Sequence, residues 1–124
     1  MPLGCGECKK TNALQITQSL VLPPDSRSDD IILQVVKCAS CGFHGLAVYE
    51  ESRRGGIDSE SWSHTAYRVS NRDLKAVSAA IRSCPSPKNQ SCRCQSHRQL
   101  GKRDVGGRWS GLIDIEIESS FPIR

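Results

Sequence analysis

The chain has 124 residues and a formal net charge of +4, and 37% of its residues are apolar. This length is typical of one domain or of two small modules that share a core. No apolar run approaches the roughly 18 residues of a membrane span, and the first residues carry no secretory or lipidation signal, so we expect a cytoplasmic protein with no membrane partner. Because thiols stay reduced in the cytoplasm, the seven cysteines indicate metal sites in preference to disulfides.

The first part of the chain predicts three strands, at residues 13–22, 31–37 and 45–49. In the first strand, Leu14, Ile16 and Leu20 stand at even spacing, which places all three on one face. A Pro-Pro pair and several polar residues separate the first strand from the second. Residues 52–63 are predicted as a long polar loop.

One helix is predicted between Ser70 and Cys84. Ser70, with Asp73 three residues later, forms a variant of the capping box, and the proline after Cys84 stops the helix. Its buried face carries Leu74, Val77 and Ile81. After an irregular segment at residues 84–97, the alternation of isoleucine with acidic residues at 112–118 predicts a last strand with one face in water.

Two Cys-x-x-Cys pairs flank the first two predicted strands. They are Cys5-Gly-Glu-Cys8 and Cys38-Ala-Ser-Cys41. Two intervening residues form a tight turn that points both sulfur atoms at one ion, and two such turns complete a tetrahedral zinc site of four cysteines. We call these four residues the first cluster.

This arrangement resembles the zinc-ribbon family, in which two such turns at the ends of β-hairpins hold one zinc ion. The resemblance covers residues 3–50, and Cys38-x-x-Cys41-Gly42-Phe43 carries it most clearly. The first turn departs from the family pattern, because Lys9 stands where glycine is common. The alternatives are two unrelated buried pairs or a redox motif, and a thioredoxin-type motif needs a βαβ unit that this sequence does not predict.

The remaining three cysteines predict a second cluster with one histidine: Cys84, Cys92, Cys94 and His97. Cys92 and Cys94 present their sulfur atoms on the same side of an extended segment, and Cys94 and His97 share a face if a helical turn begins there. Three cysteines and one histidine are a known composition of structural zinc sites, so we predict two Zn²⁺ ions per chain. His64 and His44 remain alternative fourth ligands.

Neither cluster predicts catalysis. Four protein ligands leave no position for water or substrate, and the motifs of zinc deaminases, zinc proteases, phosphate-binding loops and serine hydrolases are absent. We therefore assign no catalytic residue. A hydrolase that uses His64, with Trp62, Asp58 and Glu60 nearby, is a weaker alternative, because a lone histidine beside a tryptophan more often packs against a core.

Positive charge concentrates in one segment. Seven lysine or arginine residues lie between Arg82 and Arg108, against the single acid Asp104. We name residues 93–108 the basic arm, with the side chains of Arg93, Arg98, Lys102, Arg103 and Arg108. Such a concentration is typical of a surface that contacts phosphates, although a solvated face or a protein-binding face would look similar.

Together these patterns predict a small, β-rich α+β domain stabilised by zinc. Residues 1–50 form a zinc-ribbon-like module, and residues 51–124 add the helix, the second zinc site and the last strand, with one shared core. The predicted function is a non-catalytic module that contacts nucleic acid or serves a nucleic-acid machine through the basic arm. The alternative is a protein-interaction adaptor or inhibitor, for which the strand at Ile113–Ile117 would offer an edge.

Overall fold

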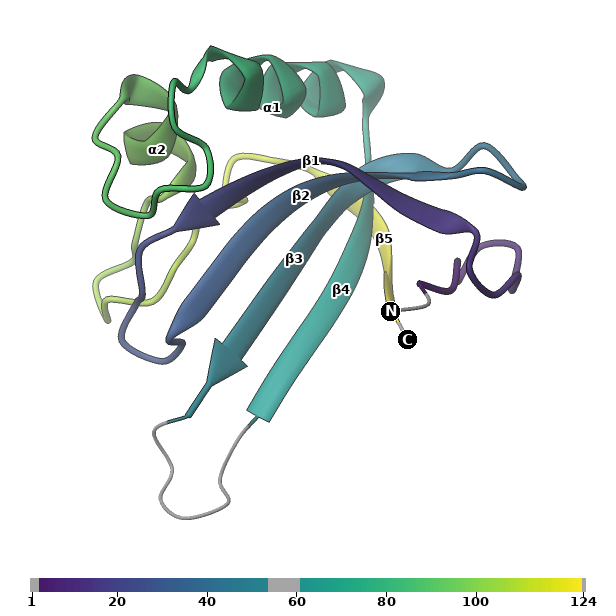
Figure 1. The fold of residues 1–124 in the computed structure, drawn as a ribbon, viewed down its shortest axis with the longest axis horizontal. Helices are drawn as coiled ribbons and strands as arrows, with labels where there is room; N and C mark the ends of the chain where they lie inside the picture. Colours follow the sequence, from purple (N-terminus) through teal and green to yellow (C-terminus); the bar gives the residue numbers. More distant parts are fainter. Residues whose placement is uncertain (1–2, 54–60, 124) are drawn as a thin grey trace.

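The computed structural model describes residues 3–53 and 61–123. Within these ranges the chain forms a five-stranded antiparallel sheet in the order β1-β2-β3-β4-β5, and two helices (Figure 1). The elements are β1 (Leu14–Leu22), β2 (Asp30–Cys38), β3 (His44–Ser52), β4 (Ser61–Val69), α1 (Asn71–Ser83), α2 (Gln95–Leu100) and β5 (Ile117–Pro122).

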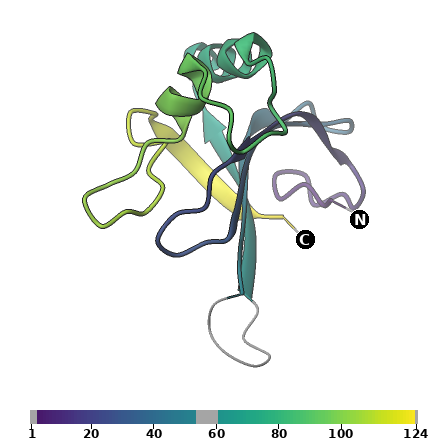
Figure 2. The ribbon, with the colours of Figure 1, turned by 60° about the vertical axis from the view of Figure 1, so that its left-hand side comes forward.

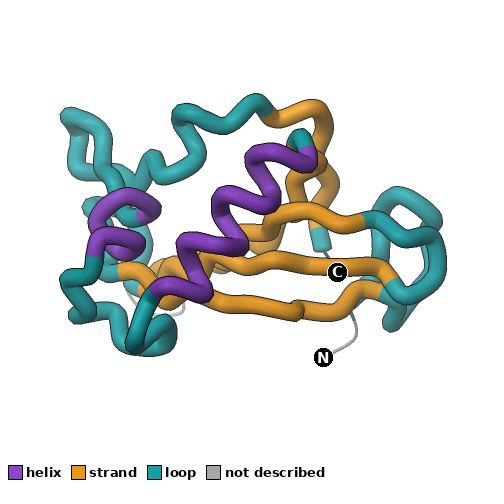
Figure 3. Tube along the Cα trace, turned by 90° about the horizontal axis from the view of Figure 1, so that it is seen from above, coloured by secondary structure: helices purple, strands orange, loops and turns teal. Residues whose placement is uncertain are grey.

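Both helices lie on the same side of the sheet. Seen from above, α1 crosses the strands diagonally, and α2 lies beyond its C-terminal end (Figure 3). The buried side chains between the helices and the strands form the helix-side core, which includes Leu20, Leu33, Leu46, Leu74, Val77 and Ile81. Alternate residues of the same strands build a smaller far-side core on the opposite face, which includes Leu14, Val36, Phe43, Ala47, Ala66 and Ile123.

The helix α1 begins and ends where the sequence predicts. The Ser70 side chain accepts a hydrogen bond from the Asp73 amide at 3.1 Å, which satisfies one free donor of the first turn. At the other end Cys84 is the C-cap, and its amide donates to the Ile81 carbonyl. The predicted apolar face, Leu74, Val77 and Ile81, is buried.

The strand β1 does not keep its apolar residues on one face. The pairing register shifts between Ile16 and Gln18, so the chain contains a bulge there. Leu14 therefore packs in the far-side core, whereas Leu20 packs in the helix-side core. The prediction that Leu14, Ile16 and Leu20 share a face is wrong, because one extra residue in a strand reverses the side of every residue that follows.

The predicted loop at residues 52–63 is also corrected. β3 continues to Ser52 and β4 begins at Ser61, so Trp62 and His64 belong to a strand. Asp58 and Glu60 lie outside the described residues. His64 and Ala66, two residues apart, are both buried, as the two-residue period of a strand requires. The many serine residues of this segment hide that period in the sequence.

The strand predicted at 112–118 is displaced toward the C-terminus. Residues 111–114 form turns, and β5 begins at Ile117, whose partner on β4 is Val69. Leu112 and Ile115, three residues apart, pack against the helix-side core, while Ile113 is 71% exposed. A segment with this alternating pattern forms a strand only if it can pair with a neighbouring strand. Because β4 ends at Val69, the partner of Ile117, the residues before Ile117 have no part of β4 to pair with.

The boundary predicted after residue 50 falls inside β3, and the sheet and the helix-side core contain residues from both sides of it. In the described part of the chain, neither helix has the length and apolar character needed to cross a membrane.

Gly45, at the start of β3, provides a test of packing beside the first cluster. A Cβ atom there would lie 2.4 Å from the Tyr67 carbonyl oxygen and 2.7 Å from the Phe43 ring. We expect Gly45→Ala to lower the free energy of unfolding by about 2 kcal/mol, measured by urea denaturation.

The neighbouring Gly42 is the matched control. Its φ is +79°, but a Cβ atom would meet nothing within 4 Å. Gly42→Ala should therefore cost only the conformational term of about 1 kcal/mol. Equal losses in the two variants would contradict the packing argument.

Candidate metal centres and the basic arm

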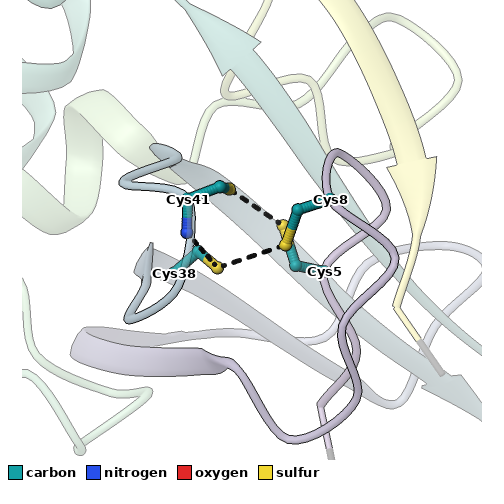
Figure 4. Close-up of side chains that lie close together, drawn as sticks. All are labelled: Cys5, Cys8, Cys38 and Cys41. Atoms are coloured by element: carbon teal, nitrogen blue, oxygen red, sulfur yellow. Dashed lines mark hydrogen bonds between the residues drawn. The ribbon is translucent and has the colours of Figure 1, made fainter.

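The four cysteines of the first cluster come from two separate turns. Cys5 and Cys8 precede β1, whereas Cys38 is the last residue of β2 and Cys41 lies in the turn that leads to β3. Figure 4 shows the two pairs facing each other across a small space. The Sγ atoms of Cys5 and Cys41 are 3.8 Å apart, and so are those of Cys8 and Cys38.

These distances fit a tetrahedral metal site. A zinc–sulfur bond of roughly 2.3 Å places two sulfur atoms of a regular tetrahedron about 3.8 Å apart. All four ligand atoms lie within 4.8 Å of one another, so the first cluster can hold one metal ion.

The second turn of this cluster favours the ionised form of its first cysteine. The amides of Cys41 and Ser40 donate to the Cys38 sulfur at 3.4 and 3.3 Å. These hydrogen bonds, the Cys41 amide first, outweigh burial and lower the pKa of Cys38 to about 6. A thiolate at this position is the form that binds a metal ion.

Both turns have the same backbone conformation after their second cysteine. Gly42 has φ +79° and Lys9 has φ +64°. The absence of glycine in the first turn therefore does not change its shape, although a residue with a Cβ atom is less stable in this conformation.

The second cluster assembles at the ends of the two helices. Cys84 is the C-cap of α1, and Cys94 is the N-cap of α2, with its sulfur accepting from the His97 amide at 3.4 Å. The Sγ atoms of Cys84 and Cys92 are 3.8 Å apart. The Nδ1 atom of His97 lies 3.5 Å from the Cys94 sulfur and 3.1 Å from the Cys84 sulfur.

A hydrogen bond on the other side of the ring fixes the role of His97. Its Nε2 atom lies 3.0 Å from the Val21 carbonyl oxygen, which can only accept, so Nε2 carries the proton. The Nδ1 lone pair then points to the three sulfur atoms, as in metal sites whose histidine ligand is held by an outer hydrogen bond. The structure thus groups His97, and neither His44 nor His64, with these cysteines.

The amide of His97 also acts on its neighbour Cys94. Its hydrogen bond lowers the pKa of that thiol to about 6, whereas burial raises the pKa of Cys84 to about 11. All four ligand atoms lie within 4.8 Å, so this cluster too can hold one metal ion. Each cluster supplies four protein ligands, which leaves no coordination position for a substrate in a tetrahedral site.

His64 sits apart from both clusters on the far face of the sheet. It is 8% exposed, and its Nε2 atom is 2.7 Å from Gln34 Oε1. The ring packs edge-on against Tyr49, which in turn stacks on Trp62. Burial lowers the pKa of His64, so the neutral imidazole is the favoured form in this position.

The C-terminal part of the basic arm lies in a hairpin-like loop at residues 102–110. Arg103 and Trp109 form an isolated β-bridge, and the Ser110 amide donates to the Lys102 carbonyl. Asp104 closes the tip, because its carboxylate accepts from the amides of Gly106 and Arg108.

This hairpin is fixed to the loop between β1 and β2, which lies beside it in Figure 2. The carboxylate of Asp25, 7% exposed, accepts from the amides of Arg27, Ser28 and Trp109 at 2.8, 2.6 and 2.6 Å. In addition, the Ser26 amide donates to the Gly107 carbonyl. Asp25 is not among the residues predicted from the sequence, since the Asp-x-x-Ser turn is visible there but the contact of Asp25 with Trp109 spans 84 residues.

All five side chains of the basic arm are exposed, but they differ in their partners. Lys102 forms an ion pair with Asp114 at 3.3 Å, and Arg103 donates to the Pro24 carbonyl. For Arg93, Arg98 and Arg108 no ion pair is found among the residues that the structure describes.

Comparisons with protein-family models, with curated proteins and with solved structures find no match for this chain. The functional assignment therefore depends on the geometry of the two clusters and of the basic arm.

Proposed function

We propose that this protein is a non-catalytic zinc module that binds the phosphate backbone of nucleic acid through its basic arm. The observation that carries the proposal is the arm itself: five exposed cations on one segment that begins at the second cluster and is fixed again by Asp25. A rigid arm loses little entropy when it binds.

Zinc is the metal that best fits the donor sets. Sulfur and imidazole ligands in tetrahedral arrangement are typical of structural zinc, whereas magnesium and calcium take oxygen ligands. Cys5, Cys8, Cys38 and Cys41 would hold one Zn²⁺, and Cys84, Cys92, Cys94 and His97 the other. Bound as thiolates, the seven cysteines with two Zn²⁺ ions lower the charge of the protein by three from its formal +4.

The absence of catalysis is part of the same proposal. Both sites offer a full set of protein ligands, and such sites stabilise a fold instead of activating water. His64 is already hydrogen-bonded to Gln34 and shielded by Tyr49, which does not suit a general base that must reach a substrate.

A protein-interaction adaptor is the second candidate. One observation favours it: β5 is the last strand of the sheet, so one of its edges has no partner strand in the described part of the chain. A peptide could add a strand at such an edge.

The test is salt-dependent binding of fluorescently labelled nucleic acid to the zinc-loaded full chain. The probes are a DNA duplex of about 20 base pairs and an oligothymidine of similar length. We expect Arg98→Glu and Arg108→Glu each to weaken binding of both probes and to reduce the slope of log K against log salt on the duplex by about 0.9. Fluorescence anisotropy from roughly 50 to 200 mM salt measures this.

The matched control is Arg72→Glu, which changes the charge equally. Arg72 is 90% exposed on α1 and lies outside the basic arm. The Arg72→Glu variant should bind both probes as tightly as the wild type does. Absence of binding by the wild type at about 50 mM salt, with zinc bound, would reject the nucleic-acid proposal in favour of the adaptor.

A further inference from the structure

A groove follows one flank of α1 from the first cluster to the second. Three hollows of about 420, 240 and 380 Å³ lie in sequence along it. The first two share His44 and Asn71, and the last two share Arg82. Cys41 lines one end and Cys84 the other, so the groove connects the two clusters along the helix seen in Figures 1 and 3.

The helix directs its positive charge toward this groove. The polar lining residues of α1 are three or four positions apart and therefore form one stripe: Asn71, Lys75, Ser78 and Arg82. The opposite flank of α1 lines a different hollow and contributes Asp73, Ala76, Val77 and Ala80 to it. The two flanks of the same helix thus differ in charge.

No free carboxylate compensates the positive side chains of the groove. Lys75, Arg82 and Lys88 are exposed, and no ion pair of theirs is found within the described residues. Glu7 is the one acid among the described residues that line the three hollows, and it is paired with Arg68 at 2.9 Å. A polyanion would therefore meet three cations that form no ion pair in the part of the chain that the structure describes, of which Arg82 also donates to the Ser78 hydroxyl, and no free carboxylate.

We propose that this groove binds one strand of single-stranded nucleic acid through its phosphates. The inference rests on the proposed function and adds the form of nucleic acid and its path. Proteins that hold single strands use a basic groove that follows the backbone, commonly together with aromatic rings on which the bases stack. The three hollows are small, about 240 to 420 Å³ each, and they follow one another along α1, which suits a single extended strand.

The continuity of the charge favours nucleic acid over an acidic peptide. Lys88 lies in the segment between Cys84 and Cys92, and Arg93 and Arg98 of the basic arm follow directly. The groove and the arm therefore form one extended path of cations, which suits a polymer with a charge on every unit. No exposed aromatic ring lines the three hollows, since Phe43 is buried under Arg68 at 5.2 Å, so the groove would contact the phosphates and give the bases no ring to stack on.

The experiment compares groove and arm variants on the same two probes, an oligothymidine of about 20 nucleotides and a duplex of equal length. We expect Lys75→Glu and Lys88→Glu each to weaken oligothymidine binding about fivefold at 0.1 M salt and to lower its salt slope by about 0.7. Duplex binding should stay within twofold of the wild type. Arg72→Glu, on the exposed side of α1, is the control that changes neither.

The outcomes separate the two proposals. Loss of binding in the arm variants alone, with groove variants like wild type, would overturn the groove and leave the proposed function standing. Equal losses on duplex and single strand in the groove variants would also overturn it, because they would indicate a general charge effect. Displacement of oligothymidine by polyglutamate at equal charge concentration would reject the single-strand proposal in favour of an acidic peptide. Unchanged zinc content and circular dichroism of each variant show that it is folded.

Discussion

Removal of the two proposed zinc ions is expected to unfold the protein. Each cluster is part of a hydrophobic core: Cys5 and Cys38 belong to the far-side core, and Cys84 belongs to the helix-side core. Structural zinc contributes on the order of 10 kcal/mol in small domains, which is comparable to the whole stability of a protein of this size. Without the ions, the thiols remain buried with no bond to hold the turns together.

Cys38→Ser is the sharpest single substitution for this test, because Cys38 is 1% exposed and accepts two amide hydrogen bonds. We expect loss of one metal ion by native mass spectrometry and loss of the cooperative thermal transition by circular dichroism. Ser40→Ala, in the same turn but without a ligand atom, should keep both ions. A transition that a strong chelator leaves unchanged would contradict the structural role of the metals.

The second large effect is expected at Asp25. Its carboxylate accepts three backbone amides in a nearly buried position, and one of them, from Trp109, holds the basic arm. Asp25→Ala leaves these amides without acceptors, so we expect a loss of about 3 kcal/mol in the free energy of unfolding and a melting temperature about 10 °C lower. Hydrogen exchange of the Trp109 amide should become fast in the same variant.

Two variants test whether the stabilisation comes from the contact of Asp25 with Trp109 or from its turn with Arg27 and Ser28. Asp25→Asn retains an oxygen for the amides of Arg27 and Ser28 but can present an amide group to Trp109, so it should lose protection at Trp109 first. Asp104→Ala removes an exposed carboxylate that also accepts two amides, and should cost less than about 1 kcal/mol. Equal losses at Asp25 and Asp104 would show that Asp25 has no special role.

The pKa of Asp25 gives this prediction a pH dependence. Burial raises the pKa, but the amides of Trp109, Ser28 and Arg27 and the charge of Arg103 together outweigh burial and lower it. A carboxyl whose folded pKa is lowered stabilises the fold fully above its unfolded pKa of about 3.9, and loses that contribution as the pH falls through the folded value. An NMR titration of the Asp25 carboxyl should therefore give a midpoint below about 3.9.

The local signals in the sequence predicted the parts that depend on neighbouring residues. The cap of α1 at Ser70 follows from a three-residue spacing, and the paired cysteines follow from the two-residue turn that one metal ion requires. The first three strands were predicted in the right place because their apolar residues are contiguous or alternate over short distances.

The errors occurred where a distant segment decides the structure. Ile113, Ile115 and Ile117 alternate with acids as a strand would. However, β4 ends at Val69, so the chain before Ile117 turns, and Leu112 and Ile115 pack on the helix-side core instead. Trp62 and His64 were predicted in a loop because pairing with β3, which the local pattern does not reveal, makes this serine-rich segment a strand.

By itself the sequence determined the types of candidate ligand and the grouping of the cysteines, since the spacing of Cys84, Cys92 and Cys94 limits how the chain can turn. Only the tertiary structure decided which histidine completes the second cluster, because the Val21 carbonyl that orients His97 lies 76 residues away. The groove along α1 and the contact of Asp25 with Trp109 were decided in the same way. Each depends on contacts between side chains and amides that are far apart in the chain and come together only when the sheet forms. A local sequence pattern therefore cannot predict them.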